Sequence, residues 1–166
     1  MRCTAVLVTT LAVASAVSAA AAERVDVSKI ISKTDAANIL GQPVKTPTPL
    51  NVDSKDGYYS KCNYYSTKSV RSLLVRVREA AENTLDPEKE FEQVAVSGGA
   101  MKPVDSLGDR AGMFNGAPEN GLPPNVVILY AVKGKFFVTV GIGGLKDEAA
   151  AVEKAKEVTR KILAQL

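Results

Sequence analysis

The segment VVILYAVKGKFFVTVGIGG, residues 126–144, constrains the fold more than any other part of the chain. Two runs rich in β-branched and aromatic residues flank Lys133 and Gly134, a pattern typical of a β-hairpin with a tight turn. Both faces of the first run are apolar, with Val126, Ile128 and Tyr130 on one and Val127, Leu129 and Ala131 on the other. We therefore expect two central strands of a sheet that is covered on both sides.

The segment ISKTDAANILGQP carries start and stop signals of a helix. Ser32 can cap the N-terminus, and Asp35 stands three residues later, the spacing of a capping box. Gly41 suits a left-handed C-terminal cap, and Pro43 prevents the helix from continuing. The sequence therefore predicts a helix that begins after Ser32 and ends before Gly41.

Two further segments have helical patterns. Asp86 and Pro87 are suited to the cap and the first position of a helix that Gly98 and Gly99 would end. Residues 146–166 repeat apolar side chains at helical spacing, opposite a face of lysines and glutamates. The sequence thus predicts three helices in all.

Three more segments resemble strands. The tyrosine-rich run 58–66 favours a strand, and residues 73–78 alternate apolar and more polar side chains, which indicates a strand with one buried face. Residues 111–114 predict another strand after the turn at 106–109. The connector 43–57, which contains three prolines, allows at most an edge strand.

The order of these elements predicts the fold class. Strands that follow one another through short turns form antiparallel sheets, and three helices are available to cover them. We therefore expect an α+β domain: an antiparallel sheet with three helices packed on it. About 144 residues remain after the N-terminal segment described next, which is the size of one domain, so we assign residues 23–166 to a single domain.

Residues 1–22 have the three parts of a secretory signal peptide. Arg2 is followed by an apolar run of about 15 residues, short for a membrane span, and then by small residues that allow cleavage after Ala19 or Ala22. The alternative is a retained membrane anchor. Cleavage predicts a periplasmic or secreted protein, without a transmembrane segment once the signal is removed.

Only one cysteine remains after the predicted cleavage, because Cys3 would leave with the signal. A single cysteine cannot form an internal disulfide. Cys62 therefore either packs as a small buried apolar residue or pairs with another molecule, and we expect burial.

Several chemistries are excluded by composition. The chain has no histidine, which removes Ser-His-Asp and Cys-His catalysis and the commonest metal ligand. One cysteine cannot build a Cys-rich zinc site, and residues 51–57 lack the register of a calcium loop. With 21 basic and 18 acidic residues, the chain lacks the strong positive charge typical of nucleic-acid binders. We expect no metal, no cofactor and no nucleic-acid partner.

Several short motifs resemble a set of small exported bacterial domains. The features are DAANILG, CNYY, VDSLGDRA, the hairpin and a C-terminal helix ending in ILAQL, in this order. Many of those domains are lipoproteins of unknown function, and some resemble the PsbP-like α/β/α fold. The resemblance covers most of residues 23–166 and implies that fold and export, but no catalytic residue. The chain lacks a lipid-attachment cysteine and a second core cysteine, so neither a membrane tether nor a disulfide follows.

The tyrosine-rich strand offers a candidate ligand-binding surface. If Cys62 and Tyr64 point inward, the side chains on the opposite face are Tyr59, Lys61 and Tyr65, joined by Arg76 and Arg78 if the strands pair. Aromatic faces with nearby cations suit sugar rings or anionic groups. The alternative is a strand face with solvated charges, or one covered by a helix.

The segment VDSLGDRAGMFNG, residues 104–116, contains the other candidate residues. Gly108 and Asp109 are typical turn residues, because glycine allows positive φ and aspartate bonds nearby backbone. Asp105, Asp109 and Glu119 could instead serve a two-carboxylate glycoside hydrolase. We interpret the segment as a structural turn and assign no catalytic residue.

The sequence hypothesis is thus a non-enzymatic exported binding or accessory domain of the cell envelope, whose partner is a protein or a glycan. A carboxylate-based envelope glycan hydrolase is the alternative, so enzymatic activity stays open. Dimerisation through a sheet edge or Cys62 is a third possibility, and the sequence does not predict the oligomeric state.

Overall fold

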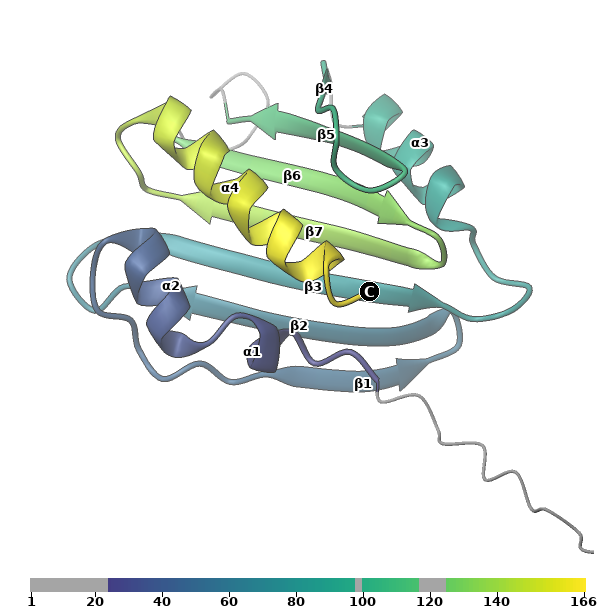
Figure 1. Cartoon of the computed structure of the whole chain (residues 1–166), viewed down its shortest axis with the longest axis horizontal. Helices are drawn as coiled ribbons and strands as arrows, with labels where there is room; N and C mark the ends of the chain where they lie inside the picture. Colours follow the sequence, from purple (N-terminus) through teal and green to yellow (C-terminus); the bar gives the residue numbers. More distant parts are fainter. Residues whose placement is uncertain (1–23, 98–99, 117–124) are drawn as a thin grey trace, which may run out of the picture.

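The computed structural model describes residues 24–97, 100–116 and 125–166, so the predicted signal peptide lies outside the described residues. The described chain forms one seven-stranded antiparallel sheet with four helices (Figure 1). The predicted α+β class with an antiparallel sheet is confirmed. The predicted number of three helices is one too few, because α1 (Val27–Ile30) adds a single turn that is too short to show helical periodicity.

The strands form two meanders that join at the middle of the sheet. The first meander contains β1 (Leu50–Ser54), β2 (Gly57–Tyr65) and β3 (Ser72–Ala80). The second contains β4 (Lys102–Pro103), β5 (Arg110–Asn115), β6 (Val126–Lys133) and β7 (Phe136–Gly143). The spatial order is β1-β2-β3-β7-β6-β5-β4, so the predicted hairpin 126–143 is central and the predicted edge strand is β1.

The helices begin where the sequence signals stand. In α2 (Lys33–Leu40) the Ser32–Asp35 capping box is complete, and Gly41 adopts φ 65°. Asp86 accepts a hydrogen bond from the Glu88 amide at 2.8 Å at the start of α3 (Pro87–Ser97), whereas Gly98 and Gly99 lie outside the described residues. Helix α4 (Glu148–Leu163) is capped by the Asp147 side chain.

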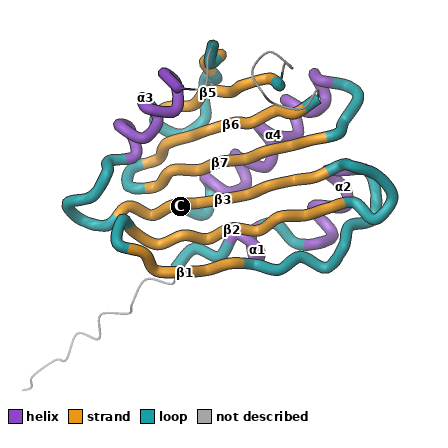
Figure 2. The backbone as a smooth tube through the Cα atoms, turned by 180° about the vertical axis from the view of Figure 1, so that it is seen from behind, coloured by secondary structure: helices purple, strands orange, loops and turns teal. Residues whose placement is uncertain are grey.

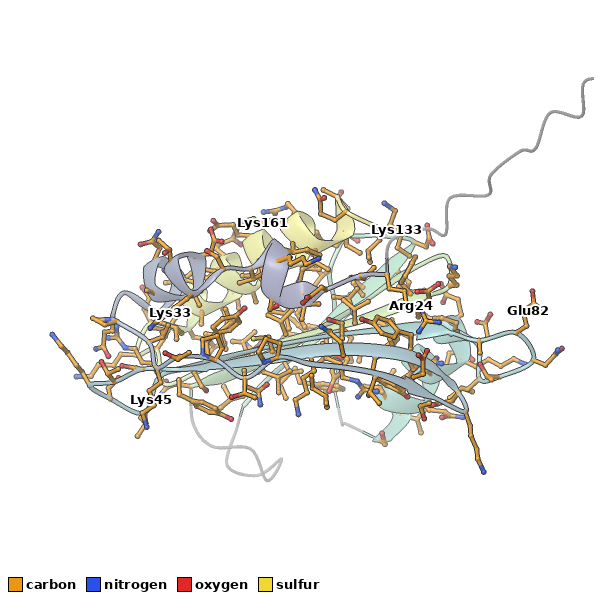
Figure 3. The ribbon with its side chains drawn as sticks, turned by 90° about the horizontal axis from the view of Figure 1, so that it is seen from below. Arg24, Lys33, Lys45, Glu82, Lys133 and Lys161 are labelled. Atoms are coloured by element: carbon orange, nitrogen blue, oxygen red, sulfur yellow. The ribbon has the colours of Figure 1, made fainter. Side chains whose placement is uncertain are left out.

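The helices lie on both sides of the sheet (Figures 2 and 3). Helices α1, α2 and α4 pack on what we call the core face, where the strands contribute buried apolar side chains such as Cys62, Val75, Leu129 and Val140. Helix α3 packs on the opposite face, which we call the α3 face, against β6 and β7. Its Phe91 forms a small second core with Val132 and Phe137.

Cys62 is completely buried on the core face, as expected, and has no disulfide partner. Burial raises the pKa of its thiol. The neighbouring Tyr64 is buried as well and donates a hydrogen bond to the Ile31 carbonyl, which fastens α1 to β2. Cys62 is therefore inaccessible to a disulfide with another molecule in this fold.

The turn at 104–109 joins β4 to β5 and is fastened to the central hairpin. Gly108 has φ 66°, and a side chain there would place its Cβ 2.2 Å from the Val132 carbonyl oxygen. The Asp109 carboxylate accepts a hydrogen bond from the Gly134 amide at 2.7 Å. Within the described residues, no helix has the length and apolar character needed to cross a membrane.

Candidate functional site

Helix α3 covers only one end of its face, and a groove lies on the part beside it. Side chains of β2, β3, β6 and β7 line this groove, whose cavity volume is about 380 Å³. Its lining residues include Lys61, Leu74, Arg76, Ile128, Tyr130, Thr139, Gly141 and Gly143. Four neighbouring strands thus contribute to one surface, which is why sheet register decides its composition.

Strand register arranges the α3 face in rows that cross the strands. Arg78 pairs with Phe137, and Phe137 with Val132, so this row lies under α3. The next row is polar and consists of Lys61, Arg76, Thr139 and Tyr130 in register. The row after it is apolar and consists of Leu74, Gly141 and Ile128. The groove therefore has a polar side next to α3 and an apolar side away from it.

The depth of the apolar side comes from Gly141. It lies between Leu74 on β3 and Ile128 on β6, both of which are half-buried. A Cβ at this position would be 3.5 Å from the Leu74 Cβ, an ordinary contact, and the backbone of Gly141 does not have positive φ. The glycine is thus not required by the backbone, and its missing side chain leaves the floor of the groove open.

Two cations stand on the polar side. The Arg76 side chain is 36% exposed; its guanidinium lies 4.8 Å from the centre of the Tyr59 ring and 4.0 Å from a Glu90 carboxylate oxygen. Within the described part of the chain, the Lys61 ammonium group has neither an ion pair nor a hydrogen bond. Glu90 is shared with Arg78, so this side of the groove carries net positive charge.

Thr139 lies in the centre of the polar row. The residue is only 9% exposed, yet its hydroxyl oxygen has no hydrogen-bond partner among the described residues. Burying a hydroxyl without a partner costs free energy. Beside it, burial raises the pKa of Tyr130, so the Tyr130 hydroxyl stays protonated at neutral pH.

The structure divides the five predicted binding residues into three groups. Lys61 and Arg76 line the groove. Tyr59 and Tyr65 lie on the α3 face but do not line the groove. The Tyr59 hydroxyl donates a hydrogen bond to Asp56, and Tyr65 is 53% exposed at the end of β2. The pairing of β2 with β3 that the prediction required is present.

Arg78 has a structural role. It is 1% exposed, and its guanidinium donates to Glu90 at 2.6 Å and to the carbonyls of Asp56 and Leu85 at 3.0 and 2.8 Å. These bonds join β3 to α3, to the loop that precedes α3 and to the β1–β2 turn. Because its donors are occupied, we do not include Arg78 in the candidate site.

The candidate carboxylates lie elsewhere. Asp105 and Asp109 line a separate cavity of about 410 Å³ next to Phe91 and Met101. Asp109 is bound to the hairpin, as described above, and Glu119 lies outside the described residues. In the described part of the chain, no three acidic or cysteine side chains come together as a metal site would require.

Sequence reasoning missed the other groove residues, among them Leu74, Ile128, Thr139 and Gly141. The available signal was the two-sided apolarity of residues 126–143. We expected complete cover from this pattern, but α3 covers the end of the face around Phe137 and Val132 and leaves the part around Gly141 uncovered. Strand register, which places Gly141 between Leu74 and Ile128, cannot be obtained from periodicity alone.

Comparisons with family models, with curated proteins and with solved structures found no match to this chain. The resemblance to PsbP-like domains therefore stays a prediction.

Proposed function

We propose that this chain is an exported, non-enzymatic binding domain of the cell envelope, and that the groove on the α3 face is its binding site. The observation that carries the proposal is the combination of an open apolar floor at Gly141 with a buried, unpartnered hydroxyl at Thr139. Ligand sites are typically concave and mostly apolar, with a few placed polar groups. The groove has this composition.

The size of the groove indicates which kind of partner it can bind. A volume of about 380 Å³ lies within the range of small-molecule sites, roughly 300–1,000 Å³. The sequence hypothesis named a protein or a glycan as partner. The apolar floor of Leu74, Gly141 and Ile128 is better suited to a small envelope component with an apolar part.

The exported location and the family rest on the sequence. The signal-peptide pattern of residues 1–22 supports a periplasmic or secreted location. Helices on both faces of the sheet support a PsbP-like α/β/α arrangement. N-terminal sequencing of the protein from cells is the direct test of export: a start at residue 20 or 23 supports it, and retention of residues 1–22 contradicts it.

Photo-crosslinking in intact cells tests the binding site. A benzoylphenylalanine replaces Leu74 in the groove or, as a control, Val96, which is 87% exposed on α3. We expect a specific adduct at position 74 and none at position 96. Equal adducts at both positions, or no adduct at position 74, contradict the groove as the binding site.

One observation favours the hydrolase alternative, namely the cavity that Asp105 and Asp109 share. Glycoside hydrolases need two carboxyl groups that face the same bond. The hydrogen bond from Gly134 to Asp109 gives that carboxylate a structural task instead. Turnover of envelope glycans by the purified chain, abolished by Asp105→Asn, supports the hydrolase; absence of turnover supports the binding domain.

A further inference from the structure

We propose that the groove binds a small amphiphile with a carboxylate head and a medium-length aliphatic chain. The head lies on the polar row, near Lys61, Arg76 and Thr139, and the chain lies over Leu74, Gly141 and Ile128. This inference names the ligand class of the proposed binding site and rests on that proposed function.

The charge of the polar row selects the sign of the head group. The Lys61 side chain has no ionic partner among the described residues, and the ionic partner of Arg76 is distant, because Glu90 lies 4.0 Å from it and 2.6 Å from Arg78. A cationic head would meet these two positive charges, whereas an anionic head complements them. Hydrogen bonds between charged groups are also stronger than neutral ones.

Thr139 supplies a second, independent reason for a polar head at this place. The residue lines the groove and is 9% exposed, and its hydroxyl oxygen is buried and has no partner in the described part of the chain. When the Thr139 side chain turns towards the groove, a carboxylate oxygen above the polar row can accept a hydrogen bond from this hydroxyl. The free energy lost by burying the hydroxyl without a partner is then recovered when the ligand binds.

The order of the polar and apolar rows along the strands determines how the ligand lies in the groove. Residues two apart on a strand lie roughly 7 Å apart on the same face, so the distance from Thr139 past Gly141 to Gly143 is about 13 Å. Gly141 leaves room along this line, which narrows at Gly143, where the Ser72 hydroxyl oxygen would lie 3.0 Å from a Cβ. A single aliphatic chain fits such a narrow floor, whereas a sugar would place hydroxyls on apolar side chains.

The first test varies only the head group. The chain without residues 1–22 is titrated with decanoate, decanol and decyltrimethylammonium below their micellar concentrations, and binding is followed by amide chemical shifts. We expect decanoate to bind at least about tenfold more tightly than decyltrimethylammonium, with decanol between them. Equal affinities for all three overturn the charge assignment.

The second test varies the protein with matched controls. Lys61→Glu should weaken decanoate binding about tenfold, whereas Lys55→Glu, the same charge change in the exposed β1–β2 turn, should leave it unchanged. Thr139→Val should weaken it roughly fivefold, and Gly141→Leu should abolish it by filling the floor. If the Gly141→Leu variant does not fold, the smaller change Gly141→Ala replaces it in this binding test. Equal losses from the two lysine variants overturn the proposal.

Three outcomes separate this inference from the proposed function. A specific crosslink at position 74 in cells, together with no preference for decanoate, overturns the ligand class and leaves the binding site standing. Binding to phosphatidylglycerol vesicles that Gly141→Leu does not reduce shows attraction to an anionic surface and also overturns the ligand class. No adduct at position 74 contradicts the proposed function itself.

Discussion

The two faces of the sheet differ in what covers them, although the same strands build both. On the core face, helices α1, α2 and α4 cover side chains such as Leu129 and Val140, which are completely buried. On the α3 face, the neighbouring Ile128 is half-buried beside Gly141, and Thr139 has an unpartnered hydroxyl. The helical cover therefore decides whether an apolar strand face becomes core or binding surface.

Within the α3 face, Arg76 and Arg78 show the same contrast between a covered and an uncovered side chain. Arg78 lies under α3, is 1% exposed and has its donors occupied by Glu90 and two carbonyls. Arg76 lies two residues earlier on the same strand and face, but its side chain is 36% exposed and borders the groove. An identical side chain thus anchors a helix in one place and stays available in the other.

The largest effect that tests this contrast is expected at Arg78. Arg78→Ala leaves Glu90 without its main partner and the Leu85 carbonyl without its side-chain donor, so it should lower the free energy of unfolding by about 4 kcal/mol. Arg76→Ala should cost less than about 1 kcal/mol, because its ion pair is long and exposed. Urea unfolding measures both; equal losses contradict the division of the face.

The next effect compares the faces through adjacent residues of β6. Leu129→Ala creates a cavity in the core and should cost about 3 kcal/mol. Ile128→Ala removes a half-buried side chain from the groove, so its cost should be about 1 kcal/mol. Thermal and urea unfolding of both variants provide the comparison, and a larger loss for Ile128→Ala shows that the groove is packed.

A smaller effect on the free energy of unfolding is expected at Asp35, in a helix of the core face, and this effect depends on pH. Hydrogen bonds from Ser32, and then the contact with Lys161, lower the pKa of Asp35 to about 2. Because the pKa is lowered in the folded state, the stabilisation is complete above about pH 4 and disappears as the pH falls towards 2.

The variant Asp35→Asn lacks this carboxylate at every pH. It should be about 1 kcal/mol less stable than the original chain at pH 7, a modest value because the carboxylate is partly exposed. The difference should vanish near pH 2 when urea unfolding is repeated there. Asp105→Asn, an exposed carboxylate on the turn, is the control; a constant difference across this pH range contradicts the assignment.

The smallest effect is expected at Thr139. Thr139→Val removes the unpartnered hydroxyl with little change of shape, so the free energy of unfolding should rise by up to about 1 kcal/mol. Thr159 on the core face is the matched control, because its hydroxyl donates to the Ala155 carbonyl at 2.8 Å and Thr159→Val should not stabilise the chain. Calorimetric unfolding temperatures resolve this difference. Destabilisation by Thr139→Val indicates that its hydroxyl has a partner.

Local residue patterns predicted many elements because their causes are local. The capping box of Ser32 and Asp35, the left-handed Gly41, and the central hairpin at Lys133 and Gly134 each depend on residues within a few positions of one another. Helix α1 was missed because a single turn has no periodicity, and its stability comes from packing Val27 against β2. Lys61 and Arg76 were correctly placed on one face by alternation.

The chain's order of apolar, polar and turn residues was enough to specify an α+β domain with a central hairpin and an edge strand, because propensity, alternation and capping act over short distances. The groove could not be predicted from the sequence and is formed only by the tertiary structure. It depends on the register that aligns Leu74, Gly141 and Ile128 across three strands, and on α3 packing at the other end of this face, around Phe137 and Val132. Both are contacts between residues far apart in the chain, where local pattern holds no information.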